Sequence, residues 1–504
     1  MKNDVDICLL LEGTYPYVRG GVSSWMHQII KGLPEFSFHI IFLGSEPTLY
    51  SKPAYDLPDN VVGFEIHYLL PFEDNKIPTP TVGDRRLFDS WQRFLTFFNS
   101  AKEPIPSELL GEIVDFLGKK NKLSLTDFLN SRASWDVLTE HYQQQQTNES
   151  FVDFFWTYRN IYQALFVLAS ISQSLPNARA YHSISTGYAG FLGACCRQTS
   201  NRPFLITEHG IYTKERKIDL SQVSWITDKH DLLDVSMHKS MDATRQTWTR
   251  FFEQLGMSAY HQADRVVALF EGNRQRQHAD GATSDKTQVI ANGIDIERFS
   301  SAYEQRLDIP PMVVGLVGRV VPIKDIKTFI RTLKSAVEKI PTIEGWIIGP
   351  AEENEIYAHE CRLLISSLGL EDRVKMLGSQ NVAEIMPKLG IIMLTSISEA
   401  QPLVLLEAMA SGIPCIATDV GACSEILNGM AGEDASLGSC GMIIPIASPT
   451  VGAKAIIKLF SDAGIWRKTG DIGKTRVAKY YDQELMYDAY RHLYKGAIDG
   501  GYRL

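Results

Sequence analysis

The chain has few cysteines, and none of them has a metal-binding spacing. Seven cysteines are spread over 504 residues, at positions 8, 195, 196, 361, 415, 423 and 440. Their number is odd and no two form a C-x-x-C pair. The sequence therefore predicts neither a disulfide framework nor a structural zinc site.

Long apolar runs and a secretory leader are also missing from the sequence. Asp4 and Asp6 precede the apolar run at residues 7–11, where a secretory signal would have a basic region. The longest apolar candidate, residues 160–173, contains polar positions and is shorter than the about 20 residues of a membrane helix. We therefore expect a cytoplasmic protein without a membrane span.

Positive charge is in the minority. The chain has 50 Lys and Arg against 59 Asp and Glu, a net charge of −9, which repels a phosphate backbone. Nucleic acid is therefore not an expected partner. Hydrophobic residues make up 44% and charged residues 22% of the chain, as in ordinary globular proteins, and the length suggests two to four domains.

The first half of the chain has the pattern of a parallel α/β domain. Apolar runs of strand length occur at residues 5–11, 38–43, 204–207 and 265–269, and the first is followed by a glycine-containing loop and a helix-period segment. Residues 71–150 interrupt this pattern with aromatic and helix-like stretches. We expect a helical insertion there, with a polar tip at residues 143–146.

The second half alternates more regularly and predicts a second α/β domain. Its expected strands are residues 313–317, 345–348, 374–377, 391–394 and 415–418. We predict a first domain at 1–298, a second at 299–480, and a last helix at 481–504 that docks back on the first domain. The amphipathic pattern places Leu485, Ala489, His492 and Leu493 near one face of this helix.

Two glutamates stand eight residues apart in S-I-S-E-A-Q-P-L-V-L-L-E-A-M-A-S-G-I-P at residues 396–414. Pro402 fits the first turn of a helix that Gly412 ends, so Glu399 should lie in the loop after a strand and Glu407 in the helix body. Both carboxylates can accept hydrogen bonds from vicinal hydroxyls. The alternative is a solvated loop glutamate and a surface helix glutamate, and spacing alone does not decide between them.

Two cations lie on the loop that follows the first strand of the second domain, in G-R-V-V-P-I-K at residues 318–324. Arg319 and Lys324 could neutralise a diphosphate that lies against backbone N–H groups. The alternative is a pair of solvated surface cations.

Two features of the first domain are further site candidates. His209 follows an apolar strand, where a structural histidine is the common alternative to a catalytic one. Gly20 and Gly21 would let the backbone come close to a phosphate or a sugar, and the alternative is a simple tight turn.

The E-x7-E pair, with the second glutamate opening E-A-M-A-S-G-I-P, resembles the retaining glycosyltransferases of family 4. The resemblance implies an α/β GT-B fold, in which two Rossmann-like domains face a cleft and the second holds the nucleotide-sugar. It assigns the donor sugar's hydroxyls to Glu399, the ribose to Glu407 and the diphosphate to Arg319 and Lys324. Ala400 and Gln401 stand where the family often has a glycine and an aromatic residue.

The same resemblance gives the complete set of expected site residues. His209 would position the donor sugar, and Glu425, after the turn at Gly421, would be a weaker third donor contact. The expected catalytic residues are His209, Arg319, Lys324 and Glu399, and the expected substrate-binding residues are Gly20, Gly21, Arg319, Lys324, Glu399, Leu403, Val404 and Glu407.

Residues 11–25 and 207–216 further resemble the PelF group of bacterial exopolysaccharide transferases. This implies a UDP-sugar donor, specifically UDP-glucose, and a saccharide acceptor in Pel biofilm polysaccharide synthesis beside an inner-membrane synthase complex. We expect no metal cofactor, because GT-B enzymes need none and the chain has no convincing D-x-D or histidine cluster.

Two other functions remain open from the sequence. One is a GT-B epimerase acting on UDP-N-acetylglucosamine, and the other is a nucleotide-sugar-binding regulator without turnover. The segment G-D-I-G-K-T at residues 470–475 looks like the end of a P-loop, but Lys468 replaces the required glycine. ATP binding is therefore not predicted there.

Overall fold

The computed structural model describes residues 5–50, 52–69, 80–100, 103–117, 123–144, 150–222, 235–306 and 308–500. It divides into two compact units. Unit 1 consists of Met1–Ala268, Asn273–Val289 and Tyr490–Leu504, and unit 2 of Leu269–Gly272 and Ile290–Ala489. These limits differ from the predicted domain ends at residues 298 and 480. Asp4 and parts of the predicted insertion, including residues 71–79, 118–122 and 145–149, lie outside the described residues.

Unit 1 is built on a parallel sheet with the order β3-β2-β1-β4-β5-β6-β7. Its strands are β1 (Val5–Glu12), β2 (Phe38–Gly44), β3 (Val61–Tyr68), β4 (Ala178–Ser183), β5 (Phe204–Glu208), β6 (Arg265–Ala268) and β7 (Thr287–Val289). The four strands predicted for this half are confirmed. The prediction missed β3, β4 and the short β7, because their apolar residues alternate with polar ones or are few.

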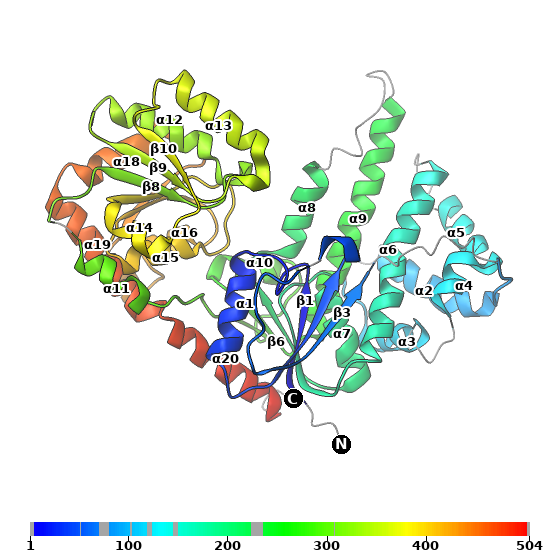
Figure 1. Cartoon of the computed structure of the whole chain (residues 1–504). Helices are drawn as coiled ribbons and strands as arrows, with labels where there is room; N and C mark the ends of the chain where they lie inside the picture. The colour runs from blue at the N-terminus through cyan, green and yellow to red at the C-terminus, as the bar shows by residue number, and fades with distance from the viewer. Residues whose placement is uncertain are drawn as a thin grey trace. The chain divides into compact units, whose positions relative to one another are not determined.

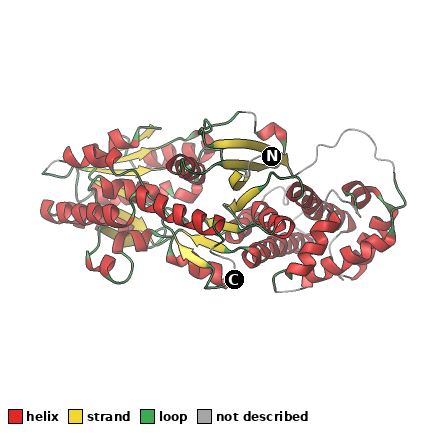
Figure 2. Ribbon diagram, turned by 90° about the horizontal axis from the view of Figure 1, so that it is seen from below, coloured by secondary structure: helices red, strands yellow, loops and turns green. Residues whose placement is uncertain are grey.

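Helices lie on both sides of the strands (Figure 2). Those that alternate with the strands are α1 (Gly21–Gly32), α7 (Tyr188–Ser200), α8 (Tyr212–Gln222), α9 (Val235–Gln262) and α10 (Glu271–Ala279). The connection from β2 to β3 has only the 3-10 turn η1 (Pro47–Leu49) among its described residues.

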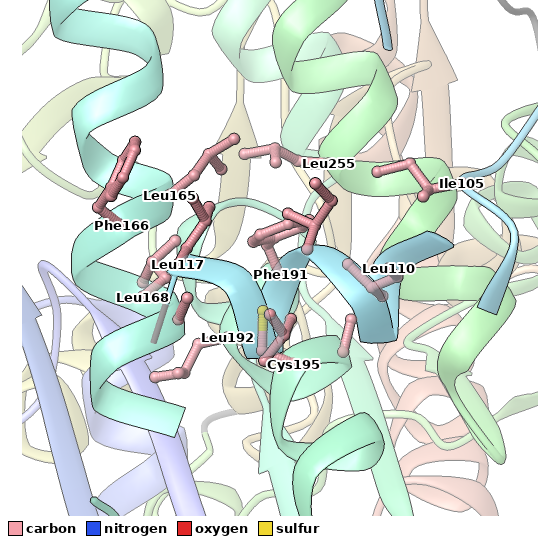
Figure 3. Close-up of a cluster of buried hydrophobic side chains, with 14 of the residues drawn as sticks. Ile105, Leu110, Leu117, Leu165, Phe166, Leu168, Phe191, Leu192, Cys195 and Leu255 are labelled. Atoms are coloured by element: carbon pink, nitrogen blue, oxygen red, sulfur yellow. The ribbon is translucent and has the colours of Figure 1, made fainter. Parts of the chain in front are cut away.

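The predicted insertion is helical and gathers beside α6 (Figure 1). Within its predicted bounds lie α2 (Arg85–Ser100), α3 (Ser107–Leu117), α4 (Leu125–Asn130) and α5 (Arg132–Gln144). The helical region continues past the predicted end at residue 150 into α6 (Phe151–Ser172). Figure 3 shows how α3 and α6 join the core of the sheet domain, with Leu110 and Leu165 meeting Phe191 and Leu192 of α7 and Leu255 of α9. The insertion is therefore part of the hydrophobic core of unit 1.

Unit 2 repeats the parallel design with the order β10-β9-β8-β11-β12-β13. Its strands are β8 (Val313–Val317), β9 (Glu344–Ile348), β10 (Val374–Gly378), β11 (Ile391–Leu394), β12 (Cys415–Thr418) and β13 (Gly441–Ile444). All five strands predicted for this half are confirmed. With two Rossmann-like parallel sheets, the predicted α/β class is confirmed as well.

The helices of unit 2 follow its strands. They are α11 (Glu297–Glu304), η2 (Pro322–Lys324), α12 (Ile326–Val337), η3 (Glu352–Asn354), α13 (Glu355–Ser367), α14 (Val382–Ile385), η4 (Met386–Lys388), α15 (Leu403–Ala410), α16 (Cys423–Asn428), α17 (Glu433–Ser436), α18 (Pro449–Phe460) and α19 (Ala463–Tyr480). The P-loop-like residues 470–475 lie inside α19, so they form helix and not a phosphate-binding loop.

The last helix, α20 (Gln483–Ile498), begins in unit 2 and ends in unit 1. In unit 1 the Tyr494 hydroxyl lies 2.8 Å from Nδ1 of His182, and the Tyr490 hydroxyl lies 3.0 Å from Oγ1 of Thr207. Both tyrosines are fully buried. The predicted face was wrong at Leu485, which is 48% exposed, and at His492, which is also exposed, because burying the tyrosine rings sets the rotation of the helix.

Among the helices that the structure describes, none has the length and apolar character that crossing a membrane requires.

Candidate active site

The strand order of unit 2 places one pair of loops apart from the others. The chain winds outward from β8 through β9 to β10 on one side, and from β11 through β12 to β13 on the other. The loops that leave β8 and β11 therefore run in opposite directions at the carboxyl ends of these strands, which is where open α/β sheets typically bind ligands. The predicted donor motifs at residues 318–324 and 396–402 are these two loops.

The two loops are bonded to each other. The Thr395 hydroxyl donates to the carbonyl oxygens of Lys324 and Asp325, at 3.0 Å each, and the Ile397 N–H donates to the Ile323 carbonyl at 2.8 Å. Asp325 then caps α12 by accepting from the Thr328 N–H at 3.2 Å. These contacts fix the backbone from which the Lys324 side chain extends.

Lys324 of the first loop and Glu399 of the second form an ion pair. Their side chains are only 18% and 11% exposed. The Ser396 hydroxyl, fully buried, donates to the same carboxylate oxygen of Glu399 at 2.6 Å. The structure thus brings two predicted catalytic residues together, and it adds Ser396, to which the sequence prediction gave no role.

The loop that carries Glu399 is held by close backbone packing. A Cβ atom at Gly421 would lie 2.2 Å from the Glu399 carbonyl oxygen and 2.4 Å from that of Ala400, and Gly421 has a φ of +55°. Any side chain at this position would displace the loop. Gln401, which departs from the family pattern, accepts from the Asn292 N–H at 2.6 Å and is buried, so it serves the packing of this loop.

Arg319 pairs with a different carboxylate from the one that binds Lys324. One terminal nitrogen, Nη1, donates to both carboxylate oxygens of Glu353, at 2.6 and 2.7 Å. Both side chains are about half exposed, at 53% and 50%. Water screens such pairs, and they contribute at most about 1 kcal/mol. Arg319 can therefore leave Glu353 at little cost.

Glu407 differs in its surroundings from Glu399. It lies in α15, which begins at Leu403 with Pro402 as the preceding cap residue, one position later than predicted. Burial raises the pKa of its carboxyl to about 7, against the opposing charge of Arg298. Among the described residues no side chain or N–H donates a hydrogen bond to this carboxylate. Leu403 and Val404, in the first turn of α15, are half-buried against the core.

The Glu425 carboxylate, predicted as a weak third donor contact, is occupied by backbone. It accepts from the N–H groups of Glu271 and Gly272, at 3.2 and 3.1 Å. These are the first residues of α10, whose N–H groups have no partner within the helix. The carboxylate thus serves as a helix cap in this structure.

His209, in unit 1, follows β5 and is only 8% exposed. Burial lowers the pKa of its imidazole to about 3, so the ring is neutral. The Trp25 ring packs edge-on against it with a centroid separation of 4.5 Å. Nε2 of His209 and Nε1 of Trp25 are both buried without a hydrogen-bond partner among the described residues. Buried polar atoms seldom lack a hydrogen-bond partner, which indicates that a ligand or a water molecule bonds to them.

A buried carboxylate that sequence analysis missed lies directly before His209. Glu208 accepts from the hydroxyls of Thr186, at 2.9 Å, and Tyr260, and from the Gln277 amide at 3.2 Å. Burial raises its pKa. These three partners come from three separate segments of the chain, so no local sequence signal could have indicated the network.

Gly20 and Gly21 lie at the start of α1, with Gly20 as the cap residue in an extended conformation. A Cβ atom at either position would meet no atom of the described chain within 4 Å. Packing and backbone strain therefore do not require glycine here, whereas the close approach of a ligand to the backbone would.

Each of the two units contains residues that match a family model. Residues 5–285, more than half of the chain, match the model described as a domain of unknown function, DUF3492. The chain belongs to the DUF3492 family. Residues 311–462 of this DUF3492 protein match the model described as glycosyl transferases group 1, and they contain Arg319, Lys324, Glu399 and Glu407.

Curated relatives of this DUF3492 protein match over parts of their length. It is 34% identical over 132 residues, 26% of the chain, to N-acetyl-alpha-D-glucosaminyl L-malate synthase of Bacillus anthracis, and covers 32% of that protein. It is 31% identical over 225 residues, 43% of the chain, to exopolysaccharide phosphotransferase SCO2592 of Streptomyces coelicolor. The match covers 22% of the latter. The chain thus spans about a third or less of these two proteins.

Solved structures share the fold of this DUF3492 protein over nearly the whole chain. Sucrose-phosphate synthase from Thermosynechococcus elongatus superposes with a TM-score of 0.58 and 17% identity, covering 98% of this chain and 99% of that one. Anabaena Alr3699/HepE in complex with UDP and glucose gives a TM-score of 0.55 and 16% identity, covering 97% and 99%. The predicted GT-B fold is confirmed by these neighbours.

Proposed function

We propose that this DUF3492 protein is a retaining glycosyltransferase that moves a sugar from a UDP-sugar to a growing exopolysaccharide. The Lys324–Glu399–Ser396 constellation at the topological switch point of unit 2 carries the proposal. It joins a cation to a hydrogen-bonding carboxylate within the residues that match glycosyl transferases group 1.

In the proposed reaction the bond between the anomeric carbon of the donor sugar and the β-phosphate oxygen breaks. A bond from the acceptor hydroxyl oxygen to the same face of that carbon forms, and the hydroxyl proton passes to the departing phosphate. Negative charge grows on the diphosphate in this step. Lys324 and Arg319 would stabilise that charge, and such preorganised groups typically lower a barrier by about 3 to 4 kcal/mol each.

The ion pairs of the free protein suit this role. A diphosphate would replace Glu399 as the partner of Lys324 and Glu353 as the partner of Arg319. The Glu399 carboxylate would then be available to bind the donor sugar's hydroxyls. Ser396 would keep that carboxylate in place during the exchange, because its hydrogen bond does not depend on Lys324. The Arg319 exchange is inexpensive, since the pair is exposed.

Glu407 and His209 have the features of ligand-binding groups. The Glu407 carboxylate has no donor among the described residues and would accept hydrogen bonds from the ribose hydroxyls. His209 is neutral, and its unpartnered Nε2 would bond a sugar hydroxyl. Gly20 and Gly21 would allow the backbone to approach a bound substrate, and Leu403 and Val404 would border the nucleotide.

The proposal also names the donor, the enzyme class, the product and the place of the reaction. UDP-glucose is the proposed donor, family 4 the proposed class, and a Pel-type biofilm polysaccharide the proposed product. The proposed place is the cytoplasm, beside an inner-membrane polysaccharide synthase complex. Support comes from the resemblance of residues 11–25 and 207–216 to the PelF group, and from the relative whose name refers to exopolysaccharide.

The decisive experiment incubates the full-length protein with a panel of UDP-, ADP- and GDP-sugars, with and without saccharide acceptors, and measures nucleotide release and product linkage. A transferase releases UDP in the presence of acceptor and retains the anomeric configuration, as NMR of the product would show. An epimerase converts UDP-N-acetylglucosamine without acceptor, and a regulator binds without turnover. Either of the last two outcomes, or an inverted anomer, would contradict the proposal.

A further inference from the structure

The first turns of α6 present an apolar stripe on the surface of the insertion in unit 1. Val152, Phe155, Trp156 and Arg159 are spaced i, i+3, i+4 and i+7, which places them on one face of the helix. Val152 is 62% exposed and Trp156 is 50% exposed. Large apolar side chains gathered on one exposed helix face are unusual unless something covers them.

A cavity of about 370 Å³ lies beside this stripe, between α6, α5 and α4. Trp135 of α5 forms part of its wall and is 43% exposed. Its ring centroid lies 5.5 Å from that of Phe151 and 6.1 Å from that of Phe155, so α5 and α6 contribute to one aromatic surface. The rest of the wall is largely apolar and includes Phe128, Leu129, Leu138 and Tyr158.

The charged side chains that line the cavity are both cationic. They are Arg132 and Arg159, and none of the described lining residues is a carboxylate. Arg132 pairs with Asp136 at 2.9 Å, but the two side chains are 73% and 39% exposed, so the pair is weak. A positive rim on a chain of net charge −9 favours an acidic partner by charge complementarity.

Several polar groups of the cavity are already bonded within the protein. The Ser134 hydroxyl donates to the Phe128 carbonyl at 2.5 Å, and Ser131 Oγ accepts from the Ser134 N–H at 3.1 Å. The Tyr158 hydroxyl accepts from Trp91 at 2.8 Å. An apolar side chain needs few hydrogen-bonding groups and fits the aromatic wall that is present.

We infer that this cavity receives an apolar anchor side chain from a partner protein, on a segment whose acidic residues flank the anchor and meet Arg132 and Arg159. Val152 and Trp156 of α6 are exposed beside the cavity, and Val82, next to the lining residue Thr81, is 82% exposed, so a macromolecule fits this region better than a small ligand. Trp and Arg around a pocket are typical of the centre of protein interfaces. The inference goes beyond the proposed transfer reaction and does not depend on it.

The test selects random 12-residue peptides displayed on phage against the full-length protein, and it compares their binding to matched variants. We expect enriched peptides with Phe, Leu, Ile or Trp within a few residues of Asp or Glu. Arg159→Glu and Trp135→Ala should each weaken a labelled selected peptide at least tenfold in fluorescence anisotropy, and added NaCl should weaken it further. Arg93→Glu is the control, because Arg93 is an exposed arginine of α2 outside the cavity.

Thermal melts and UDP release by each variant separate loss of binding from loss of folding or of the proposed activity, since none of these residues belongs to the unit 2 site. The inference is overturned if no peptide distinguishes the wild type from Arg159→Glu, or if the enriched peptides are basic. It is equally overturned if hexose oligomers, and not peptides, quench tryptophan fluorescence in a manner that Trp135→Ala removes.

Discussion

The polar residues at the carboxyl edges of the two parallel sheets differ in whether they form ion pairs. In unit 2 the key groups are charged and neutralise each other, as Lys324 does with Glu399 and Arg319 with Glu353. In unit 1 His209 is neutral and buried, and Glu208 is enclosed by donors. The same fold therefore presents exchangeable ion pairs on one sheet, and on the other a neutral buried imidazole next to a carboxyl group that is hydrogen-bonded within the protein.

The difference indicates different ligand chemistry. Paired charges suit a ligand that brings its own charge, because a diphosphate replaces the partner that each cation loses. The neutral imidazole of His209 suits an uncharged ligand group such as a hydroxyl, which brings no charge to replace that of an ion pair. The predictions that follow test this contrast, from the largest expected effect to the smallest.

The largest effect should come from removing a unit 2 cation. Lys324→Ala and Arg319→Ala should each lower turnover by about 10²- to 10³-fold with a smaller effect on UDP-sugar binding, because the charge matters most as the diphosphate departs. Steady-state kinetics with UDP-glucose measures both. Lys327→Ala, which removes a partly exposed cation of α12 paired with Glu360, is the control. Turnover within about threefold of wild type for both variants, under about 1 kcal/mol of barrier, would exclude this role.

The two glutamates of unit 2 should differ in kind. Glu399→Gln should lower kcat and the discrimination between UDP-glucose and UDP-galactose, because it disturbs hydroxyls near the reacting carbon. Glu407→Ala should weaken UDP and UDP-sugar alike by about tenfold and raise KM more than it lowers kcat. Kinetics and UDP inhibition for both variants check this. Identical profiles, or unchanged UDP affinity in Glu407→Ala, would show that the roles are wrongly assigned.

The buried carboxyl of Glu407 should also make the stability of the fold depend on pH. Its folded pKa, about 7, is above its ordinary value of 4.5, so the folded state holds the proton more tightly and loses stability as pH rises from 4.5 to 7. Glu407→Gln should therefore raise the free energy of unfolding at pH 7.5 by about 1 to 3 kcal/mol while it weakens UDP binding. Denaturant unfolding at pH 4.5 and 7.5 measures the gain, which should vanish at the lower pH.

His209 should shift stability in the opposite direction. Its folded pKa, about 3, is below the ordinary 6.5, so the unfolded chain takes up the proton first and stability falls as pH drops below 6.5. The buried neutral His209 should lower the free energy of unfolding by about 2 kcal/mol as the pH falls from 6.5 to 5, at 1.36 kcal/mol per pH unit. The difference between wild type and His209→Gln over this range isolates its share. A difference that does not change with pH would mean that the folded ring titrates normally.

The smallest change in rate should follow loss of Ser396. Ser396→Ala removes the hydrogen bond that orients Glu399 and leaves the Lys324 ion pair in place, so kcat should fall about tenfold, as for one hydrogen bond to a charged group. Ser396→Thr, which keeps the hydroxyl, should retain more activity than Ser396→Ala. Equal losses in the two variants would indicate a packing defect and not a positioning role.

How far the sequence predicts this molecule differs between its parts. Five of the six strands of unit 2 were predictable because each is a short apolar run bounded by turn residues, whereas β13 (Gly441–Ile444) was missed. The E-x7-E motif correctly indicated a loop position for Glu399 and a helix position for Glu407. β3 and β4 were missed, since strands such as Val61–Tyr68 mix polar residues into the run. The face of α20 was misjudged at Leu485, because helical periodicity does not show which of two apolar faces the tyrosines occupy.

Local sequence determined the elements and the residue types at the ends of the strands, because hydrophobic periodicity and turn chemistry act over a few residues. Only tertiary structure decided the partners of those residues. Lys324 meets Glu399 because β8 and β11 are neighbours in the sheet, although 75 residues separate them in the chain. The charge of Glu407 and His209 likewise depends on burial by distant segments, which sets their pKa values and which no local pattern contains.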